Sequence, residues 1–269
     1  MAHHQIYALR YATHDRPGSA NFVGGSDDLH QLSMPLHYYV WLIRGPFGDI
    51  LVDVGFGEEQ AARRGRHLIE RPARLLARIG VDPAAIRDVI ITHMHYDHAG
   101  CIEDFPNARF HLQDAEMAYA TGRHMRHKFL RQSYSVEDVV ALVRRLYDDR
   151  VVFHSGASSV FEGVRLHMVG GHTLGLQSVI VDTIRGPVVL ASDAFHLYRN
   201  LTDGLPFPIV HDVGEMMEGW RELMAIAGDL EHLIPGHDPL VGELYPLHDP
   251  AASSDVFALH FPPRPHENP

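Results

Sequence analysis

The sequence predicts an α+β protein in which two mixed β-sheets pack face to face with helices on the outside. Apolar, β-branched segments occur in clusters and include a pair joined by a short turn, which indicates hairpins and therefore mixed sheets. Amphipathic helical segments lie between these clusters, and each must bury its apolar face against another layer. No linker interrupts the pattern, so residues 1–269 are expected to form a single domain.

The individual elements follow from local patterns. Residues 37–44 and 49–54 are rich in aromatic and β-branched side chains and flank a Gly-Pro-Phe-Gly turn, so they are expected to pair as a hairpin. Further strands are expected at 88–92, 108–112, 151–153, 164–169, 178–183, 187–192 and 231–235, and helices at 72–79, 114–120, 136–146 and 214–227, with a helical insert or lid at 121–134.

The composition is that of an ordinary globular protein and narrows the choice of partners. Of the 269 residues, 45% are hydrophobic and 21% are charged. The formal net charge of −11 argues against nucleic acid and anionic membranes as partners, because both favour a basic surface. No secretory signal or membrane-spanning stretch is visible, so we expect a cytoplasmic location. A homodimer is compatible with the sequence but not required by it.

A dense group of potential metal ligands follows the apolar segment 88–92. It contains His93, His95, Asp97 and His98. Imidazole and carboxylate groups bind zinc and related divalent ions. His93 and His95 would face the same side of an extended chain, and the other two lie beyond them, which suits two neighbouring ions. A single histidine is more often a surface or core residue, but four ligand-type side chains directly after a buried strand indicate a metal site.

The run from His93 to His98 resembles the H-x-H-x-D-H signature of the metallo-β-lactamase superfamily. The segment LVDVG at 51–55 resembles an early strand of this family, whose aspartate, here Asp53, supports the site from behind. The similarity extends from residue 37 to residue 240. Three further segments resemble the motifs that carry the remaining ligands of the family: 171–175, 192–194 and 235–238.

This resemblance implies a four-layer αββα sandwich with a two-metal site at one edge. Zn2+ is the metal most expected, and Mn2+, Fe2+, Co2+ and Ni2+ suit the same ligands. His95 stands where the oxygen-reducing diiron branch of the family has Glu, which favours hydrolysis over redox chemistry. Carried over residue by residue, the resemblance implies that the first ion is held by His93, His95 and His172. The second ion would be held by Asp97, His98 and His237, and Asp193 would contact both.

Within the superfamily, the motif spacing and the segments 171–178 and 192–194 most resemble the N-acyl homoserine lactonase branch. That branch opens lactone rings, including bacterial quorum-sensing signals. The implied reaction is attack of a metal-bridging hydroxide on the lactone carbonyl, after which Asp97, or water near it, would protonate the leaving alkoxide. We therefore expect an ester hydrolase that acts on an N-acyl homoserine lactone or another small lactone.

One position departs from the lactonase pattern. That branch usually has a tyrosine three residues after the bridging aspartate, near the substrate carbonyl, and here this position is His196. Neutral imidazole can donate a hydrogen bond and transfer a proton near neutral pH, so His196 is expected to replace the tyrosine. Tyr198 could supply the phenol instead. The difference also leaves open another cyclic ester or an amide as the substrate.

The walls of the substrate pocket are expected from the segments 18–36, 121–134 and 196–211. The basic run at 123–131 could recognise a carboxylate on a substrate, although such a run is more often a solvated helix face. Candidate lining residues are Phe22, Met34, Met125, Phe129, Phe207 and His211.

Other hydrolases of the superfamily fit less well. A thioester hydrolase of the glyoxalase II type is an alternative, but that group adds a helical domain after the last histidine, whereas 32 residues follow His237 here. A zinc β-lactamase is disfavoured because Asp193 stands where those enzymes usually have Cys. A nuclease is poorly supported by the net charge of −11. A non-catalytic metal-binding role would leave the open coordination positions of the site unused.

Overall fold

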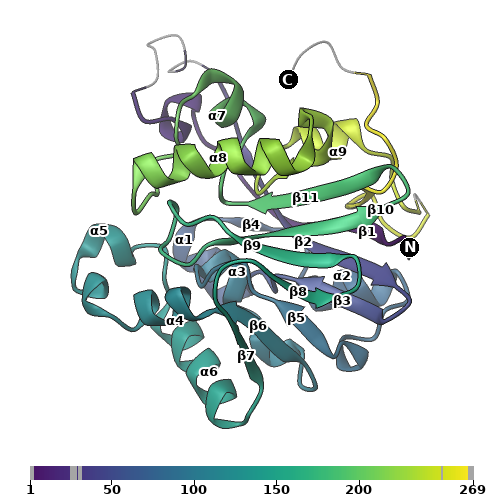
Figure 1. Ribbon diagram of the computed structural model, residues 1–269, viewed down its shortest axis with the longest axis horizontal. Coiled ribbons are helices and arrows are strands. Elements are labelled where there is room, and N and C mark those ends of the chain that lie inside the picture. The colour runs from purple at the N-terminus through teal and green to yellow at the C-terminus, as the bar shows by residue number, and fades with distance from the viewer. Residues whose placement is uncertain (1–2, 25–28, 30–31, 250, 266–269) are drawn as a thin grey trace.

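Two β-sheets pack face to face between helical layers, so the predicted αββα architecture is confirmed (Figure 1). The space between the sheets is filled by apolar side chains, among them Trp41, Val52 and Ile90 from one sheet and Val179 and Leu190 from the other. The computed structural model describes residues 3–24, 29, 32–249 and 251–265.

The first sheet combines an antiparallel half with a parallel half. Along the sheet, its strands are β13 (Val256–Ala258), β1 (Gln5–His14), β2 (Leu36–Gly45), β3 (Gly48–Val52), β5 (Asp88–Ile90), β6 (Arg109–Gln113) and β7 (Val151–His154), and β4 (His67–Leu68) pairs with β1. The pairs from β13 to β3 are antiparallel, whereas β3, β5, β6 and β7 are parallel. Parallel strands send their carboxyl ends to one edge, which collects the loops that follow them.

The second sheet is smaller and mostly antiparallel. Its order is β12 (Leu233–Pro235), β11 (Gly186–Ser192), β10 (Gln177–Thr183), β9 (Val164–Met168) and β8 (Ser158–Phe161). The pair β11–β12 is parallel, so both strands end at the same edge.

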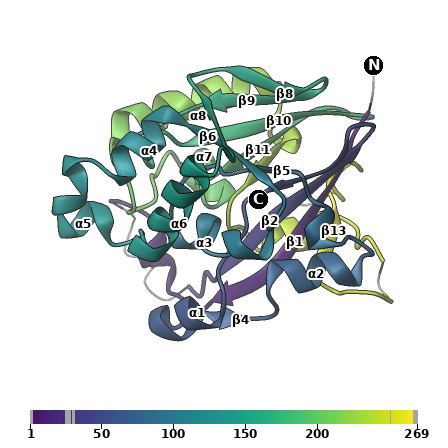
Figure 2. The same ribbon diagram turned by 90° about the horizontal axis from the view of Figure 1, so that it is seen from below.

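Helices cover the outer faces of both sheets (Figures 1 and 2). On the second sheet lies α8 (Val213–Ala227), whose Met216 and Trp220 pack with Ile180 and Val189. Helices on the first sheet and around the edge are α1 (Glu58–Arg64), α2 (Pro72–Arg78), α3 (Tyr96–Ala99), α4 (Asp114–Ala120), α5 (Lys128–Arg131), α6 (Val136–Tyr147), α7 (Tyr198–Asp203) and α9 (Leu240–Leu244), with 3-10 turns η1 (Gly18–Asn21), η3 (Pro83–Ala85), η4 (Ile102–Asp104), η5 (Arg123–Arg126) and η6 (Leu230–His232).

The predicted segments are present with shifted ends, and several elements lack a sequence signal. The strand expected at 231–235 begins at Leu233, because η6 occupies the preceding residues and the Asp229 carboxylate accepts from the backbone N–H of His232. The edge strands β4, β8 and β13 have two to four residues each, too few for a periodic pattern. The long strand β1 was also not predicted.

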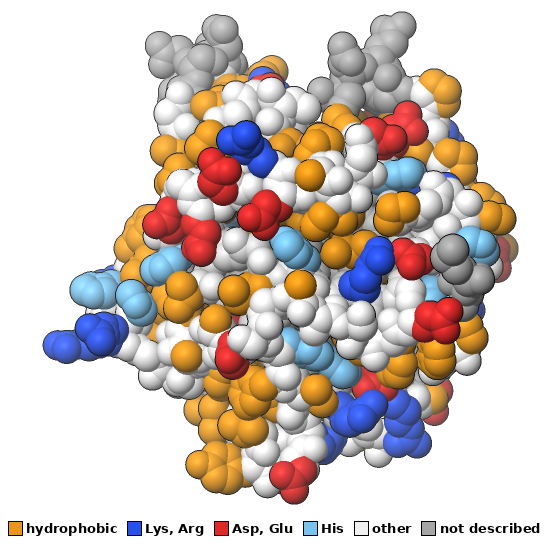
Figure 3. Space-filling view, in the orientation of Figure 1, with side chains coloured by type: hydrophobic (Ala, Val, Ile, Leu, Met, Phe, Trp, Pro, Cys, Tyr) orange, Lys and Arg blue, Asp and Glu red, His pale blue; other side chains and the backbone are white. Residues whose placement is uncertain are grey.

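Two of the three predicted pocket segments, 18–36 and 121–134, differ in how much of them the structure shows. The insert at 121–134 is helical, as expected, and forms η5 and α5. It projects from the side of the molecule, where Figure 3 shows Lys, Arg and His side chains gathered. In the segment 18–36, residues 25–28, 30 and 31 lie outside the described residues. Within the described ranges, no helix has the length and apolarity that a bilayer span needs.

Candidate metal centre

The predicted ligands lie where strands of both sheets end. His93 and His95 follow β5, and the short helix α3 that comes next carries Asp97 and His98. The second sheet contributes three residues from the loops that follow β9, β11 and β12: His172, Asp193 and His237. The structure therefore brings all seven predicted ligands to one edge of the sandwich.

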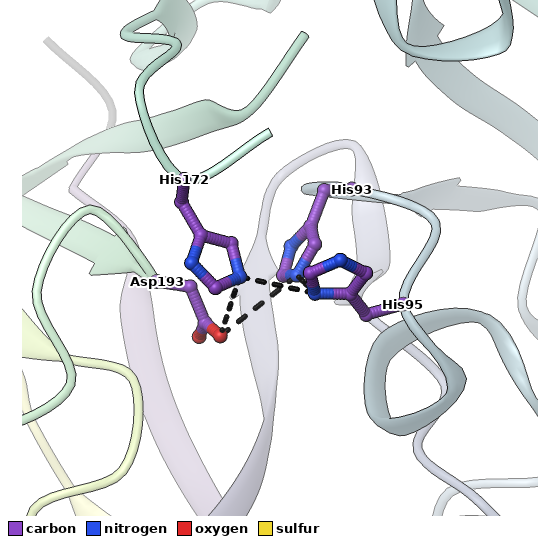
Figure 4. Close-up of side chains that lie close together, drawn as sticks. All are labelled: His93, His95, His172 and Asp193. Atoms are coloured by element: carbon purple, nitrogen blue, oxygen red, sulfur yellow. Dashed lines mark hydrogen bonds and ion pairs between the residues drawn. The ribbon is translucent and has the colours of Figure 1, made fainter. Parts of the chain in front are cut away.

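Four of these side chains converge on one point (Figure 4). The Nδ1 atom of His95 lies 3.0 Å from the Nε2 atoms of both His93 and His172. The Oδ2 atom of Asp193 lies 3.2 Å from Nε2 of His172 and 3.8 Å from Nε2 of His93. All four ligand atoms lie within 4.8 Å of one another.

A second group forms beside the first. Asp97, His98 and His237 also place one ligand atom each within 4.8 Å of the others. The Oδ1 atom of Asp193 lies 3.4 Å from Nε2 of His98 and 3.1 Å from Nε2 of His237. The two oxygens of Asp193 therefore face different groups of histidines.

The hydrogen bonds made by the Nδ1 atoms of three ligand histidines indicate what their Nε2 atoms can bind. Three rings donate through Nδ1 to an acceptor, which leaves a lone pair on each Nε2 that faces the Asp193 carboxylate. Two acceptors approach this closely only when a cation or a proton lies between them. The residues present thus fit divalent ions. The three supporting contacts are His172 to the Ile209 carbonyl (2.8 Å), His237 to the His37 carbonyl (2.9 Å) and His98 to Oδ2 of Asp53 (2.7 Å).

The electrostatic environment of the first group favours neutral rings. Burial, followed by the neighbouring histidines, lowers the pKa values of His93 and His95 well below 6.5. An imidazole must be deprotonated at the ligating nitrogen to bind a metal. Both rings are therefore in the form that can act as a ligand at neutral pH.

Asp53 supports the site in the way the sequence resemblance implied. It is buried and has a left-handed backbone conformation with a φ of 60°, which is unusual for a residue other than glycine. Its carboxylate accepts from the backbone N–H of Thr92 at 2.7 Å, from the Thr92 hydroxyl at 2.8 Å and from His98. These bonds fix the start of the ligand loop and the orientation of one ligand together.

Glycines in the ligand motifs are required by close contacts. Gly171 has a φ of 79°, and a Cβ there would lie 2.4 Å from backbone atoms of Met216 on α8. A Cβ on Gly236 would lie 2.6 Å from Oδ1 of Asp193. Any larger residue at either position would displace the ligand next to it.

Glu116 is a supporting residue that the sequence analysis missed. It is fully buried on α4 and accepts from the backbone N–H of Met94 at 2.9 Å, from that of Gly175 at 3.1 Å and from the Tyr134 hydroxyl at 2.8 Å. It thereby joins the loop of His93 and His95 to the loop of His172. No motif marks this residue, and its only signal is a carboxylate within an apolar helix.

A cavity of about 140 Å³ opens onto the ligand cluster. Of the predicted lining residues, Phe207 lies in its wall, together with Tyr38 and Ile209. The wall also contains three arginines that were not predicted, Arg16, Arg64 and Arg66.

The other predicted lining residues lie elsewhere. Phe22 is buried in the core and Met34 packs against it. Met125 lines a neighbouring cavity of about 630 Å³ together with Lys128 and Arg131 of the basic run. Phe129 is 59% exposed and lines a hollow of about 10 Å³ together with His95 and His172, whereas His211 packs on Tyr119 and His124.

His196 lies in the site and Tyr198 does not. The Nε2 atom of His196 lies 3.1 Å from Oδ2 of Asp193, and its ring stacks on Phe207 at 3.5 Å between centroids. Burial lowers the pKa of His196 to about 3, so the ring is neutral and its Nε2–H donates to the carboxylate. Tyr198 is buried between the sheets, where its hydroxyl donates to the carbonyl of Leu233 at 3.1 Å.

The fold and the converging histidines and aspartates are those of a hydrolase whose site is suited to divalent metal ions. Residues 34–237 match the model of the metallo-β-lactamase superfamily, and the chain belongs to that superfamily. Similar curated proteins include an N-acyl homoserine lactonase of a Bacillus species, 28% identical over 189 residues that cover 65% of this chain and 70% of the relative. A probable metallo-hydrolase of Mycobacterium tuberculosis is 26% identical over 242 residues, covering 78% and 74%.

Solved structures show the same fold. A quorum-quenching N-acyl homoserine lactone lactonase superposes with a TM-score of 0.73 at 24% identity, over 88% of this chain and 92% of that one. A hydrolase of the β-lactamase superfamily also gives a TM-score of 0.73, at 18% identity and over 88% and 87%. At these identities the similarity establishes the fold alone.

Proposed function

We propose that this protein is a dinuclear metal-dependent hydrolase that opens a small lactone ring. The observation that carries the proposal is the position of Asp193, whose two carboxylate oxygens face two separate groups of histidines at the end of a cavity. One ion would be held by each group and Asp193 would contact both. Divalent ions held in this way act as Lewis acids, which polarise a carbonyl and lower the pKa of water.

The side chains of the protein would position the substrate and handle the proton. The cavity admits a small ring between Tyr38, Phe207 and Ile209, with the ester carbonyl toward the ligand cluster. Asp97 also lines the cavity. We assign to it, or to water beside it, transfer of a proton to the leaving alkoxide once the ring opens.

His196 is the stronger of the two candidates for the position that is usually tyrosine in related lactonases. Its Nε2–H donates to Asp193, and stacking on Phe207 fixes the plane of the ring. These contacts favour a positioning role, in which His196 orients the Asp193 oxygen that faces the first group. A direct hydrogen bond to a substrate oxygen would require the bond to Asp193 to break. Tyr198 would need a rearrangement of the core to reach the site.

The substrate class is proposed from the similarity to lactonases together with the size of the cavity. The curated lactonases that this chain resembles are named for N-acyl homoserine lactones. The cavity of about 140 Å³ is small for a ligand site, which favours a compact ring at the ligand cluster. Zn2+ is our first choice of ion, because imidazole and carboxylate ligands are typical of zinc sites.

A pH-stat assay tests the proposal, because opening a lactone releases one proton and requires no chromophore. Protein loaded in turn with Zn2+, Mn2+, Fe2+, Co2+ or Ni2+ would be offered acyl-homoserine lactones, simple γ- and δ-lactones, aromatic lactones and a thioester. We expect turnover of at least one lactone class and loss of turnover after chelation. Hydrolysis of the thioester alone would exclude the lactonase proposal in favour of a thioesterase of the glyoxalase II type.

A further inference from the structure

Three arginines surround the cavity that opens onto the metal ligands. Arg16 follows β1, Arg64 ends α1, and Arg66 lies two residues further on. All three line the same cavity as His95, Asp97 and His237, although they come from segments far from these ligands in the sequence. Three guanidinium groups are thus concentrated in a small space within a protein whose formal net charge is −11.

These arginines are among those that form no ion pair in the described part of the chain. Several other arginines pair with carboxylates, among them Arg10–Asp255, Arg44–Asp49, Arg71–Asp104 and Arg109–Asp88, whereas Arg150 also lacks a carboxylate partner there and donates to backbone carbonyls. Among the described residues, no carboxylate lies within ion-pair distance of the three cavity arginines. The carboxylates of Asp97 and Asp193 line the same cavity without forming an ion pair with these arginines, so the three positive charges are only partly offset by the described residues.

The contacts of Arg66 hold its guanidinium at the cavity and leave donors unused. Its Nε donates to the Tyr96 hydroxyl at 3.1 Å, and its Nη1 donates to the Arg64 carbonyl at 2.6 Å and lies 3.0 Å from Nε2 of His14. Its Nη2 makes no hydrogen bond to the described residues. A guanidinium has five N–H donors, so Arg66 retains a pair for a ligand.

The other two arginines are also fixed in place. Arg64 donates to the Gln132 carbonyl at 3.0 Å, and its guanidinium carbon lies 3.8 Å from the centre of the Tyr96 ring. The guanidinium carbon of Arg16 lies 5.1 Å from the centre of the Phe207 ring, and its buried Nε has no partner among the described residues. Preorganised guanidinium groups lose little side-chain entropy when they bind an anion.

The charge balance points to the missing partner. Like charges held together in a partly buried space repel one another, and divalent ions in the adjoining site would add to that repulsion. A carboxylate on the substrate would offset it and form charge-assisted hydrogen bonds. An uncharged lactone could accept hydrogen bonds from these groups but would not offset their charge.

We propose that the physiological substrate is a small lactone that carries a carboxylate, which Arg66 binds together with Arg16 and Arg64 while the ester carbonyl faces the metal ligands. This inference rests on the proposed lactonase function and adds to it the charge of the substrate. The side of the cavity that would bind the substrate carboxylate is formed by α1, the residues after it and the segment that follows β1.

Activity on a matched pair of substrates tests the inference. The pair is a γ-lactone with a ring carboxylate and the same lactone as its methylamide, assayed with metal-loaded wild type and the variants Arg66→Met, Arg16→Met and Arg74→Met. Arg74 is exposed on α2, so the control variant Arg74→Met removes one positive charge outside the cavity. Thermal unfolding of each variant identifies any that fail to fold, and Arg16→Met then replaces Arg66→Met.

We expect wild type to prefer the carboxylate by about 10-fold or more in kcat/KM. Arg66→Met should lower kcat/KM for the carboxylate about 10- to 100-fold more than for the amide, mainly through KM, because hydrogen bonds to charged groups contribute about 1.5–3 kcal/mol. Arg74→Met should retain the wild-type preference. Equal use of the two lactones by wild type, or a preference that Arg66→Met leaves intact, would overturn the inference.

A binding measurement separates this inference from the lactonase proposal. Calorimetry with tetrahydrofuran-2-carboxylate, which has no ester, should show binding to wild type and to Arg74→Met that weakens at least about 10-fold in Arg66→Met. This result would support the anion site even if no lactone were hydrolysed. Binding that is equal in all variants would assign the carboxylate to the metal ions and reject the arginine site. Tighter binding of inorganic phosphate than of the carboxylate would reject a carboxylate as the ligand.

Discussion

Two clusters of histidine and aspartate lie around β5, but they are built differently. Beyond the carboxyl end of β5, the ring nitrogens converge with Asp193 on shared points. The other cluster is a row that begins at Asp88 on β5 and crosses β6 and β7: Nε2 of His111 lies 3.0 Å from Asp88, its Nδ1 lies 3.0 Å from Nε2 of His154, and Nδ1 of His154 lies 2.8 Å from the Ser158 hydroxyl.

The hydrogen-bond balance explains the difference. In the row, each ring can donate toward Asp88 and accept from the next residue, so every nitrogen has a partner. In the converging cluster, Nε2 lone pairs face carboxylate oxygens and require a cation. Histidine content alone therefore does not identify ligands; the direction of the lone pairs does.

The largest effect should come from removing a converging ligand. His93→Ala is expected to abolish metal binding at the first group and to lower turnover by about 10³-fold, because Lewis-acid stabilisation accounts for several kcal/mol of the barrier. Metal analysis and the pH-stat assay measure both effects. The matched change in the hydrogen-bonded row, His111→Ala on β6, should leave metal content unaltered. If His111→Ala also emptied the site, the distinction between the two clusters would fail.

Glu116→Gln should have the next largest effect. The variant keeps the shape of the side chain but weakens the acceptor that holds the backbone N–H groups of Met94 and Gly175. Loss of such supporting contacts typically lowers metal affinity or activity about 10- to 100-fold. Competition with a fluorescent chelator measures the affinity. Wild-type affinity in Glu116→Gln would show that the two ligand loops do not depend on this carboxylate.

His196→Ala should lower kcat while metal content stays close to two ions per chain. The variant removes the donor to Asp193 and the ring that stacks on Phe207, but none of the seven predicted ligands. A drop of about 10-fold is expected for one charge-assisted hydrogen bond. His196→Gln, which retains a donor, should recover part of the activity. An unchanged kcat in His196→Ala would remove this residue from the mechanism.

The smallest effect should appear in the hydrogen-bonded row. Burial and the neighbouring His111 lower the pKa of His154 below 6.5. The unfolded chain therefore takes up a proton at higher pH than the folded chain, and this residue costs stability as the pH falls through 6.5. Between pH 7.5 and 5.5, the melting temperature of His154→Gln should fall less than that of wild type. The variant should retain activity. An identical pH dependence in both proteins would contradict this assignment.

The sequence identified the converging histidines and aspartates far better than their surroundings. The seven predicted ligands belong to short motifs that directly follow strands, so local patterns mark them. Arg64 and Arg66 lie in a basic stretch at the end of α1, and only the tertiary fold shows that they reach the same cavity as Arg16. Tyr198 illustrates the opposite case, because it begins α7 and is buried in the core between the sheets although it lies two residues from His196.

The spread of the ligands along the chain has a consequence for biosynthesis. His93 is made early, but the group that includes His237 is incomplete until the ribosome has translated most of the 269 residues. The Nδ1 atom of His237 then donates to the carbonyl of His37, near the start of β2. Ions that need both groups would therefore be acquired only after this late segment has folded against β2, which would make metal loading a late event in the maturation of the protein.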